Sequence, residues 1–221
     1  LVQAGCECIG MDIGEYLGSL HIGVDILCID DCVDILRNKK TDLIIDFSSN
    51  SAAEKLLSIA SDIACKLVIC TTNHTDEMIQ RMNEVAQMNS IGVVYAPNLT
   101  LGINLLIDYV AQLSKMLPNF DFEIVERHSI VKPRVTMTAK IISKAIDRGD
   151  THISSVRAGG YVGVHEVTCA NENERITIVH ESFSRQAFAD GAMLAADFIK
   201  DKIGFYRMSD VIDEIKKKAF T

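Results

Sequence analysis

The chain has 221 residues and a mass of 24.4 kDa, enough to bury a sizeable core in one domain or two small ones. Apolar residues make up 48% of it and charged residues 24%, as in globular proteins, and no run of about 18 apolar residues predicts a membrane span. The net charge of −8, without a cluster of Lys and Arg, argues against nucleic acid as a partner. The sequence shows no export signal, so we expect a cytoplasmic protein without membrane contact.

Seven cysteines are scattered along the chain, and none of their spacings matches a paired Cys-x-x-Cys zinc motif. The six histidines do not cluster with acids or thiols at the spacing of metal ligands. Reduced, buried thiols and no metal site are therefore expected. The cysteines are Cys6, Cys8, Cys28, Cys32, Cys65, Cys70 and Cys169.

The first residues predict that part of the fold precedes them. Residues 1–5 resemble the tail of a helix with a glycine stop, and residues 6–12 are predicted as a short buried strand. A domain rarely opens on the end of a helix. We therefore expect a further segment N-terminal to Leu1.

Strands and helices then alternate. Residues 42–47, 66–70 and 91–95 are compact apolar runs, typical of buried strands. Ser51 and Glu54 have the spacing of a capping box for a helix that continues through residue 60, and Thr75 is predicted to cap the next helix. Apolar strands separated by capped helices indicate a parallel sheet covered on both faces, with ligands beyond the carboxyl ends of its strands.

The pattern changes near residue 100. An amphipathic helix over residues 101–117 precedes an alternating strand that begins at Glu123, and a second helix is predicted over 138–147. Strands follow at 153–157, 161–169 and 176–181, joined by turns at 159–160 and 171–173 that suit antiparallel hairpins. Helices from about 186 to 203 and from 209 onward are expected to return to the first domain.

The predicted fold class is therefore α/β. We expect a Rossmann-like parallel-sheet domain that lacks its first βα unit, formed by residues 1–99 with 186–221. A smaller α+β domain with an open mixed sheet, residues 100–185, is expected to bind substrate and to mediate oligomerisation.

The alternating strand ends in a pattern that suggests chemistry. His128 stands at its end, Lys132 follows four residues later, and Thr136 and Thr138 open the next helix. A proton donor, a fixed cation and a helix N-terminus suit an anionic substrate that is protonated as it reacts. The alternative is structural: His128 caps the strand, Lys132 is a solvated loop residue, and Thr136 or Thr138 caps the helix. On the following strands, Arg157 and His165 are predicted as surface or interface residues.

Six segments together resemble the dihydrodipicolinate reductase family, which reduces a cyclic imine-type dicarboxylate with NAD(P)H. The resemblance covers essentially the whole chain. Its segments, in order, are residues 45–48 (Ile-Asp-Phe-Ser), 70–72 (Cys-Thr-Thr), 96–104, 123–128 (Glu-Ile-Val-Glu-Arg-His), 156–160 with 163–165, and 180–185.

The resemblance implies roles for particular residues. The glycine-rich phosphate loop would lie N-terminal to this sequence, and Asp12 would bind the ribose hydroxyls, so that NADH serves at least as well as NADPH. His128 matches the family's proton donor and Lys132 its essential lysine. Substrate contacts would come from Ser129, Met137 and Thr138. The nicotinamide half of the cofactor would be lined by Phe47, Ser48, Cys70, Thr71, Thr72, Ala96, Pro97, Asn98 and Leu99.

The sequence also departs from the family pattern. Ser129 stands where the family has a second histidine, and the segment after Lys132 is one residue shorter. Met137 replaces a glycine that permits close approach of an anion to backbone N–H groups, while Cys70 and Asn73 replace two more glycines. These changes bear mainly on substrate affinity.

Three hypotheses follow. The first is an NADH- or NADPH-dependent reductase of this dicarboxylate in lysine and diaminopimelate synthesis. The second is a paralogous reductase of a different cyclic imine, and the third is a non-catalytic homologue that serves as a binding or assembly module. Because family members assemble as tetramers through the sheet of the second domain, the resemblance also implies a homotetramer.

Overall fold

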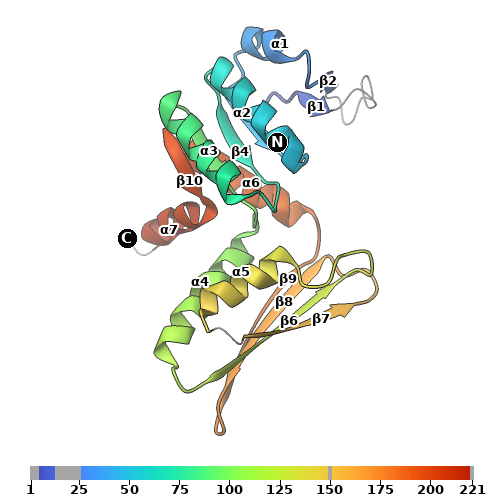
Figure 1. Cartoon of the computed structure of the whole chain (residues 1–221), viewed down its shortest axis with the longest axis vertical. Helices are drawn as coiled ribbons and strands as arrows, with labels where there is room; N and C mark the ends of the chain where they lie inside the picture. Colours follow the sequence, from blue (N-terminus) through green and yellow to red (C-terminus); the bar gives the residue numbers. More distant parts are fainter. Residues whose placement is uncertain (1–4, 13–25, 149–150, 220–221) are drawn as a thin grey trace. The chain divides into compact units, whose positions relative to one another are not determined.

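The computed structural model describes residues 5–12, 26–148 and 151–219. The chain folds as two compact units: Leu1–Pro97 with Ala192–Arg207, and Asn98–Gly191 with Met208–Thr221 (Figure 1). The prediction for residues 1–4 lies outside the described residues. Within the described part of the chain, no helix combines the length and the apolar character that a membrane crossing needs.

The first unit contains parallel strands. The pair β1 (Gly10–Asp12) and β2 (Ile26–Cys28) forms one small sheet, and a four-stranded sheet has the order β10-β5-β4-β3. All pairs in this second sheet are parallel, as predicted. Its strands are β3 (Leu43–Asp46), β4 (Lys66–Ile69), β5 (Gly92–Tyr95) and β10 (Gly204–Arg207), and the helices of the unit are α1 (Val33–Asn38), α2 (Ala53–Asp62), α3 (Asp76–Met88) and most of α6 (Gln186–Ile199).

Helix caps and strand lengths refine the sequence-based predictions. Thr75 caps α3, because its hydroxyl accepts from the Met78 N–H at 3.3 Å. The predicted capping box is wrong: α2 begins after Ala52, whose methyl group cannot cap, and the Ser51 hydroxyl instead pairs with that of Ser49 at 2.9 Å. The first predicted strand is shorter than expected and is not buried as a whole, since β1 covers only Gly10–Asp12.

Strand β10 is not predicted from the sequence, and the preceding helix α6 ends at Ile199 rather than at residue 203. The strand pairs in parallel with β5, from Gly204 opposite Gly92 to Arg207 opposite Tyr95. Gly92 is needed here, because a Cβ atom on it would lie 2.6 Å from the Lys202 carbonyl oxygen and 2.7 Å from the Ile199 side chain.

The second unit has a four-stranded mixed sheet with the order β7-β6-β8-β9. Its strands are β6 (Asp121–His128), β7 (His152–Arg157), β8 (Gly163–Ala170) and β9 (Arg175–Ser182), and its helices are α4 (Leu101–Met116), α5 (Met137–Ile146) and α7 (Met208–Ala219). The hairpin predicted at residues 159–160 is wrong: β7 pairs with β6 in parallel, and β8 pairs with β6 and β9 in antiparallel fashion. The predicted hairpin at 171–173 is confirmed.

Helices α4 and α5 cover one face of this sheet (Figure 1). Strand β6 alternates, with its even-numbered residues buried under the helices and its odd-numbered residues partly exposed on the other face. Over most of the covered face the buried residues are apolar, with Phe122 and Ile124 opposite Cys169 and Val167. At the end of β6, the covered face becomes polar.

Candidate active site

The polar end of the covered face is formed by residues that continue the buried alternation of β6, β8 and β9. Glu126 of β6 lies opposite His165 of β8, and His165 lies opposite His180 of β9. His128 is the next buried residue of β6. Glu126, His128 and His165 are at most 5% exposed. A row of titratable side chains thus occupies positions that are apolar elsewhere on the same face.

The Glu126 carboxylate lies at the N-terminus of α5 and is saturated with hydrogen bonds. It accepts from the backbone N–H of Val135 at 3.0 Å and of Thr136 at 3.1 Å, and from the hydroxyls of Thr136 and Ser155. The Arg157 guanidinium donates to it at 2.6 Å. Burial raises the pKa of this carboxyl, but the bonds from Ser155, Thr136 and Arg157 outweigh that effect and lower the pKa to about 2. Glu126 is therefore a carboxylate at neutral pH.

His128 is buried beside this carboxylate. Its Nδ1 lies 3.9 Å from Glu126 Oε2, beyond hydrogen-bond length, and finds no hydrogen-bond partner among the residues that the structure describes. Its Nε2 faces Gly163, where a Cβ atom would come within 3.2 Å. Burial lowers the pKa of His128 most, the charge of Glu126 raises it, and Arg157 and Lys132 lower it. A buried ring nitrogen without a partner is costly unless a ligand uses it.

His165 supports this arrangement from the neighbouring strand. Its ring meets that of His128 edge to face, with the centroids 5.1 Å apart. Its Nε2 lies 3.4 Å from the Thr136 hydroxyl, which donates to Glu126 and can therefore accept from the imidazole. Burial lowers the pKa of His165 to about 4, and the neighbouring His128 adds to the effect. His165 is thus neutral at physiological pH.

The other residues predicted around the substrate lie at the end of β6 and the start of α5. Lys132 is exposed in the loop after β6. Its positive charge helps to lower the pKa of His128. Ser129 is half-buried, and its N–H donates to the Tyr161 carbonyl at 3.1 Å. Met137 is the first residue of α5 and is 37% exposed. The Thr138 hydroxyl donates to Asn98 Oδ1 at 2.7 Å, and so joins a predicted substrate residue to a predicted cofactor residue.

Thr136, one of the two residues considered as helix caps, is the N-cap of α5. Its hydroxyl accepts from the Ala139 N–H at 3.3 Å, in the geometry of an N-cap. The residue before it, Val135, has a positive φ of +59°. Such a backbone conformation is strained for a β-branched residue, and the bonds from its N–H to Glu126 and Ser155 oppose its relaxation.

In the first unit, polar groups gather at the carboxyl ends of β3 and β4. Asp46 is buried, and its Oδ1 accepts from the backbone N–H of Ser48 at 2.8 Å and from the Ser48 hydroxyl. The Thr71 hydroxyl donates to Asp46 Oδ2 at 3.3 Å and lies 2.7 Å from His74 Nε2. Asn73, at a position where the sequence pattern suggests a glycine in the family, has φ +64°, in the left-handed region that glycine adopts without strain.

The remaining residues predicted at the cofactor differ in exposure. Phe47 is 57% exposed just after β3, where its ring could pack against a flat ligand. Asp12 ends β1 and is exposed, as is Thr72. Burial raises the pKa of the Cys70 thiol to about 12, so that Cys70 remains a neutral packing residue. Ala96 and Leu99 are buried, and Pro97 and Asn98 are half-buried.

Sequence reasoning missed five residues that the structure places in these clusters. Glu126 could have been found, because residues two apart on a strand share a face and Glu126 precedes His128 by two. Arg157 and His165 were expected at the surface or in an interface. That expectation is wrong, because the parallel pairing of β7 places Arg157 opposite His128 and β8 buries His165 under the helices. Asp46 lies within the segment 45–48 but was given no role of its own, and His74 belonged to no motif.

Glu126, His128 and His165 also offer three potential metal-ligand atoms, all within 4.8 Å of one another. The two histidine nitrogens lie 3.9 and 4.0 Å from Glu126 Oε2. That is wider than the roughly 3.3 Å between ligand atoms around a tetrahedral zinc. The Arg157 guanidinium on the same carboxylate further disfavours a cation. We therefore expect a salt-bridged carboxylate here rather than a metal site.

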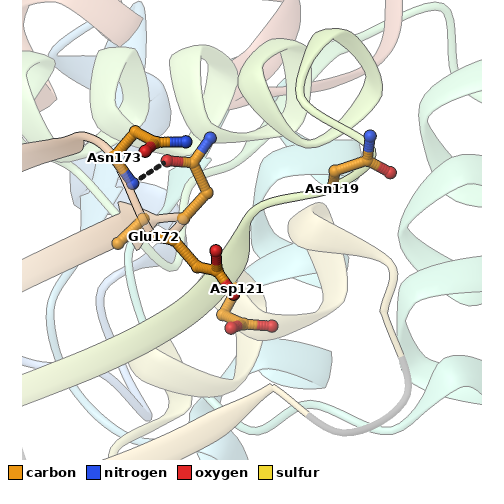
Figure 2. A pocket seen from close by; sticks show the side chains of 6 residues that line it. Asn119, Asp121, Glu172 and Asn173 are labelled. Carbon is orange, nitrogen blue, oxygen red and sulfur yellow. Dashed lines mark hydrogen bonds between the residues drawn. The ribbon is translucent and has the colours of Figure 1, made fainter.

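A shallow pocket lies at the opposite end of the same strands (Figure 2). It is formed where β6 begins and β8 turns into β9, and its charged side chains are those of Asp121 and Glu172. Asn171 closes the turn by accepting from the Asn173 N–H at 2.8 Å. Two carboxylates repel an anionic ligand. This pocket therefore does not suit a dicarboxylate, in contrast to the His128 end of the sheet.

Comparison with known proteins identifies the family. Residues 1–99 match the family described as dihydrodipicolinate reductase, N-terminus, and residues 102–212 match dihydrodipicolinate reductase, C-terminus. The chain belongs to the dihydrodipicolinate reductase family. The resemblance of the six sequence segments is thereby confirmed, and dihydrodipicolinate reductases are NAD(P)H-dependent oxidoreductases.

Relatives in this family align over most of the chain. A 4-hydroxy-tetrahydrodipicolinate reductase of Thermosipho africanus is 37% identical over 82% of this chain and 83% of its own length. One from Methanosarcina acetivorans is 34% identical over 92% of this chain and 85% of its own length. A dipicolinate-bound dihydrodipicolinate reductase from a Paenisporosarcina species shares the fold, with a TM-score of 0.74 at 20% identity over 87% of this chain and 81% of that one. The predicted combination of a Rossmann-like sheet and a mixed sheet is confirmed.

Proposed function

We propose that this chain reduces 4-hydroxy-tetrahydrodipicolinate to tetrahydrodipicolinate, with NADH or NADPH, in lysine and diaminopimelate biosynthesis. The observation that carries the proposal is the buried imidazole of His128, whose Nδ1 has no partner among the described residues and faces a fixed carboxylate at a helix N-terminus. In a family of dicarboxylate reductases, this arrangement suits a proton donor beside an anion site.

Each residue at this end of the sheet has a distinct task in the proposed reaction. The hydroxyl of the substrate leaves as water, which gives the unsaturated ring, and a bound nicotinamide cofactor would supply the hydride that a ring carbon then gains. His128 donates the proton that completes the addition, so that no uncompensated negative charge remains on the ring. Lys132 supplies a positive charge for a substrate carboxylate. Ser129, Met137 and Thr138 contact the dicarboxylate near the N-terminus of α5, where backbone N–H groups favour anions.

The cofactor is assigned to residues at the carboxyl ends of the parallel strands, and its residues fit the group. The hydroxyls of Ser48 and Thr71 and the exposed ring of Phe47 offer polar and flat contacts to a nicotinamide. Asp12 at the end of β1 would accept from ribose hydroxyls and repel a ribose phosphate, which favours NADH over NADPH. The last helix, α7, which was expected to return to the first domain, belongs to the second unit, so we assign the cofactor domain to Leu1–Pro97 with Ala192–Arg207 and the substrate and oligomerisation domain to Asn98–Gly191 with Met208–Thr221.

Assembly as a homotetramer is proposed through the face of the mixed sheet that α4 and α5 leave uncovered. Val156 and Val179 on this face are 41% and 55% exposed, and Arg127 and Glu166 form an ion pair on it at 2.9 Å. Mixed apolar and paired charged groups suit the contact of two copies. We also propose a cytoplasmic location: the structure describes all seven cysteines, and each is a free thiol.

The test is steady-state turnover of the protein on 4-hydroxy-tetrahydrodipicolinate and on a panel of other cyclic imines, with NADH and with NADPH. Turnover of the first substrate, with a lower KM for NADH than for NADPH, supports the proposal. Turnover only of another imine would favour the paralogue hypothesis, for which the exposed Met137 at the first position of α5 is the reason. Absence of both turnover and NADH binding would leave the non-catalytic homologue.

A further inference from the structure

We propose that Glu126 is the positioning residue of this site: it fastens the segment 132–136 to the sheet and supplies the negative charge beside which His128 holds its proton. The inference rests on the proposed function, because it explains how a buried histidine can remain a proton donor. Glu126 acts through His128 and α5 and needs no contact with substrate.

The first part of the inference follows from hydrogen bonds at both ends of the segment. Glu126 accepts from the N–H groups of Val135 and Thr136, at 3.0 and 3.1 Å. Its ion-pair partner Arg157 donates to the carbonyls of Lys132 at 3.0 Å and Pro133 at 2.5 Å. The buried ion pair of Glu126 and Arg157 therefore holds residues 132–136 in place against the sheet. This segment carries Lys132 and leads into α5. The positive φ of Val135 is the conformation that these bonds hold in place.

The second part follows from the charges that surround His128. From its own strand it faces Glu126, whose Oε2 lies 3.9 Å from its Nδ1. From β7 it faces the Arg157 guanidinium, from β8 the neutral ring of His165, and from the following loop the Lys132 ammonium. Among these groups Glu126 alone carries a negative charge, and it acts against burial and two cations. Without it, protonated His128 would face only positive and neutral groups.

Packing alone explains Glu126 poorly. Two residues earlier on the same face, Ile124 fills its position with an apolar side chain at 0% exposure. Burial of a carboxylate and a guanidinium costs several kcal/mol before their attraction offsets it, so packing alone does not account for the pair. The ion pair is better explained by its bonds to residues 132–136 together with the charge that it places beside His128.

The experiment compares Glu126→Gln with Glu123→Gln in the full-length protein. Glu123 lies on the same strand but on the uncovered face, where it binds His152 and Ser154. Histidine labelled with ¹³C at the ring allows the titration midpoint of His128 to be read by NMR without substrate. We expect Glu126→Gln to lower this midpoint by roughly one pH unit or more, as for loss of an opposite charge at 4–6 Å, and Glu123→Gln to leave it in place. An unchanged midpoint in Glu126→Gln would overturn the inference.

A second variant, Arg157→Gln, should shift the His128 midpoint in the opposite direction, and it therefore distinguishes an electrostatic effect from a misfolded first variant. Arg157→Gln removes a cation and leaves the carboxylate, so the His128 midpoint should rise. A general disturbance of packing would move both variants in the same direction, and that result would also overturn the inference. In kinetics, the alkaline fall of kcat should move to lower pH in Glu126→Gln, with the loss falling on kcat more than on KM.

The NMR readout separates this inference from the proposed function. If the midpoints move as expected but the wild-type protein reduces no imine, the electrostatic role of Glu126 stands and the reductase assignment fails. If the wild-type protein is an active reductase and the midpoints do not move, the inference alone fails.

Discussion

The face of the mixed sheet that α4 and α5 cover has two halves with the same backbone and different chemistry. In one half, Phe122 and Ile124 lie opposite Cys169 and Val167 and form an apolar core. In the other, Glu126 and His128 continue the same strand at the same depth. Burial of titratable groups lowers stability unless each is paired, whereas apolar residues at the same positions would raise it. The polar half therefore costs stability, as expected if its residues serve the proposed reaction.

Within the polar half, Glu126, His165 and His128 differ in how fully their hydrogen bonds are satisfied. Glu126 has all its hydrogen bonds satisfied, and His165 retains only a long contact to Thr136. His128 keeps one buried nitrogen without a partner among the described residues. Structural groups are expected to be satisfied, and reactive groups are often not. The predictions below separate these two kinds of position.

The largest effect is expected for His128→Ala. Loss of a positioned proton donor should lower kcat by about 10²–10⁴-fold and change the dissociation constant of NADH little. Stopped-flow and equilibrium binding measure the two quantities. His152→Ala, at an exposed histidine on the uncovered face of β7, is the matched control and should keep kcat. Equal activity of the two variants would show that the polar half is not catalytic.

In the apolar half, Ile124→Ala should reduce stability and leave the chemistry intact. The side chain is fully buried, so its truncation should lower the free energy of unfolding by about 3 kcal/mol, through lost transfer energy and a cavity. Urea unfolding measures the change. Val125→Ala, at the half-buried neighbour on the other face, should cost clearly less. A similar cost at both sites would contradict the assignment of the two faces.

His165 should make stability depend on pH. Its folded-state pKa of about 4 lies below the ordinary 6.5, so the unfolded chain binds more protons between these values. Stability from this group is present above pH 6.5 and is lost as the pH falls toward 4. Between pH 7 and pH 5 the free energy of unfolding should drop by about 2 kcal/mol, and less in His165→Gln. Urea unfolding of the wild type and of His165→Gln at pH 7 and at pH 5 measures these free energies. An equal decrease in the two proteins would show that His165 is not responsible.

The smallest effect is expected at Val135. Replacement by Gly removes the strain of a β-branched residue at φ +59° but adds chain entropy to the unfolded state. We expect a net gain of roughly 0.5 kcal/mol in thermal unfolding. Val131→Gly, in the same loop and without positive φ, should give no gain. Destabilisation of Val135→Gly beyond that of the control would show that the conformation is not strained.

Much of this architecture could be predicted from local sequence. The apolar runs predicted the parallel sheet of the first unit, and the alternating pattern of residues 123–128 predicted a strand that ends at His128. The partner of β7 could not be predicted, because the glycines at 159 and 160 suit a hairpin, whereas the strand pairs across the sheet with β6. That pairing brings Arg157 to the site. The strain at Val135 also left no trace in sequence, since it depends on Glu126 and Ser155.

The central claim is that the ring of His128 belongs to a dicarboxylate site. Titration of the ¹³C-histidine-labelled protein with dipicolinate, followed by NMR, tests it most directly. The account predicts that the His128 signal shifts with saturable binding and moves toward its protonated position, while that of His152 does not change. A saturable shift that leaves His128 untouched would contradict the account.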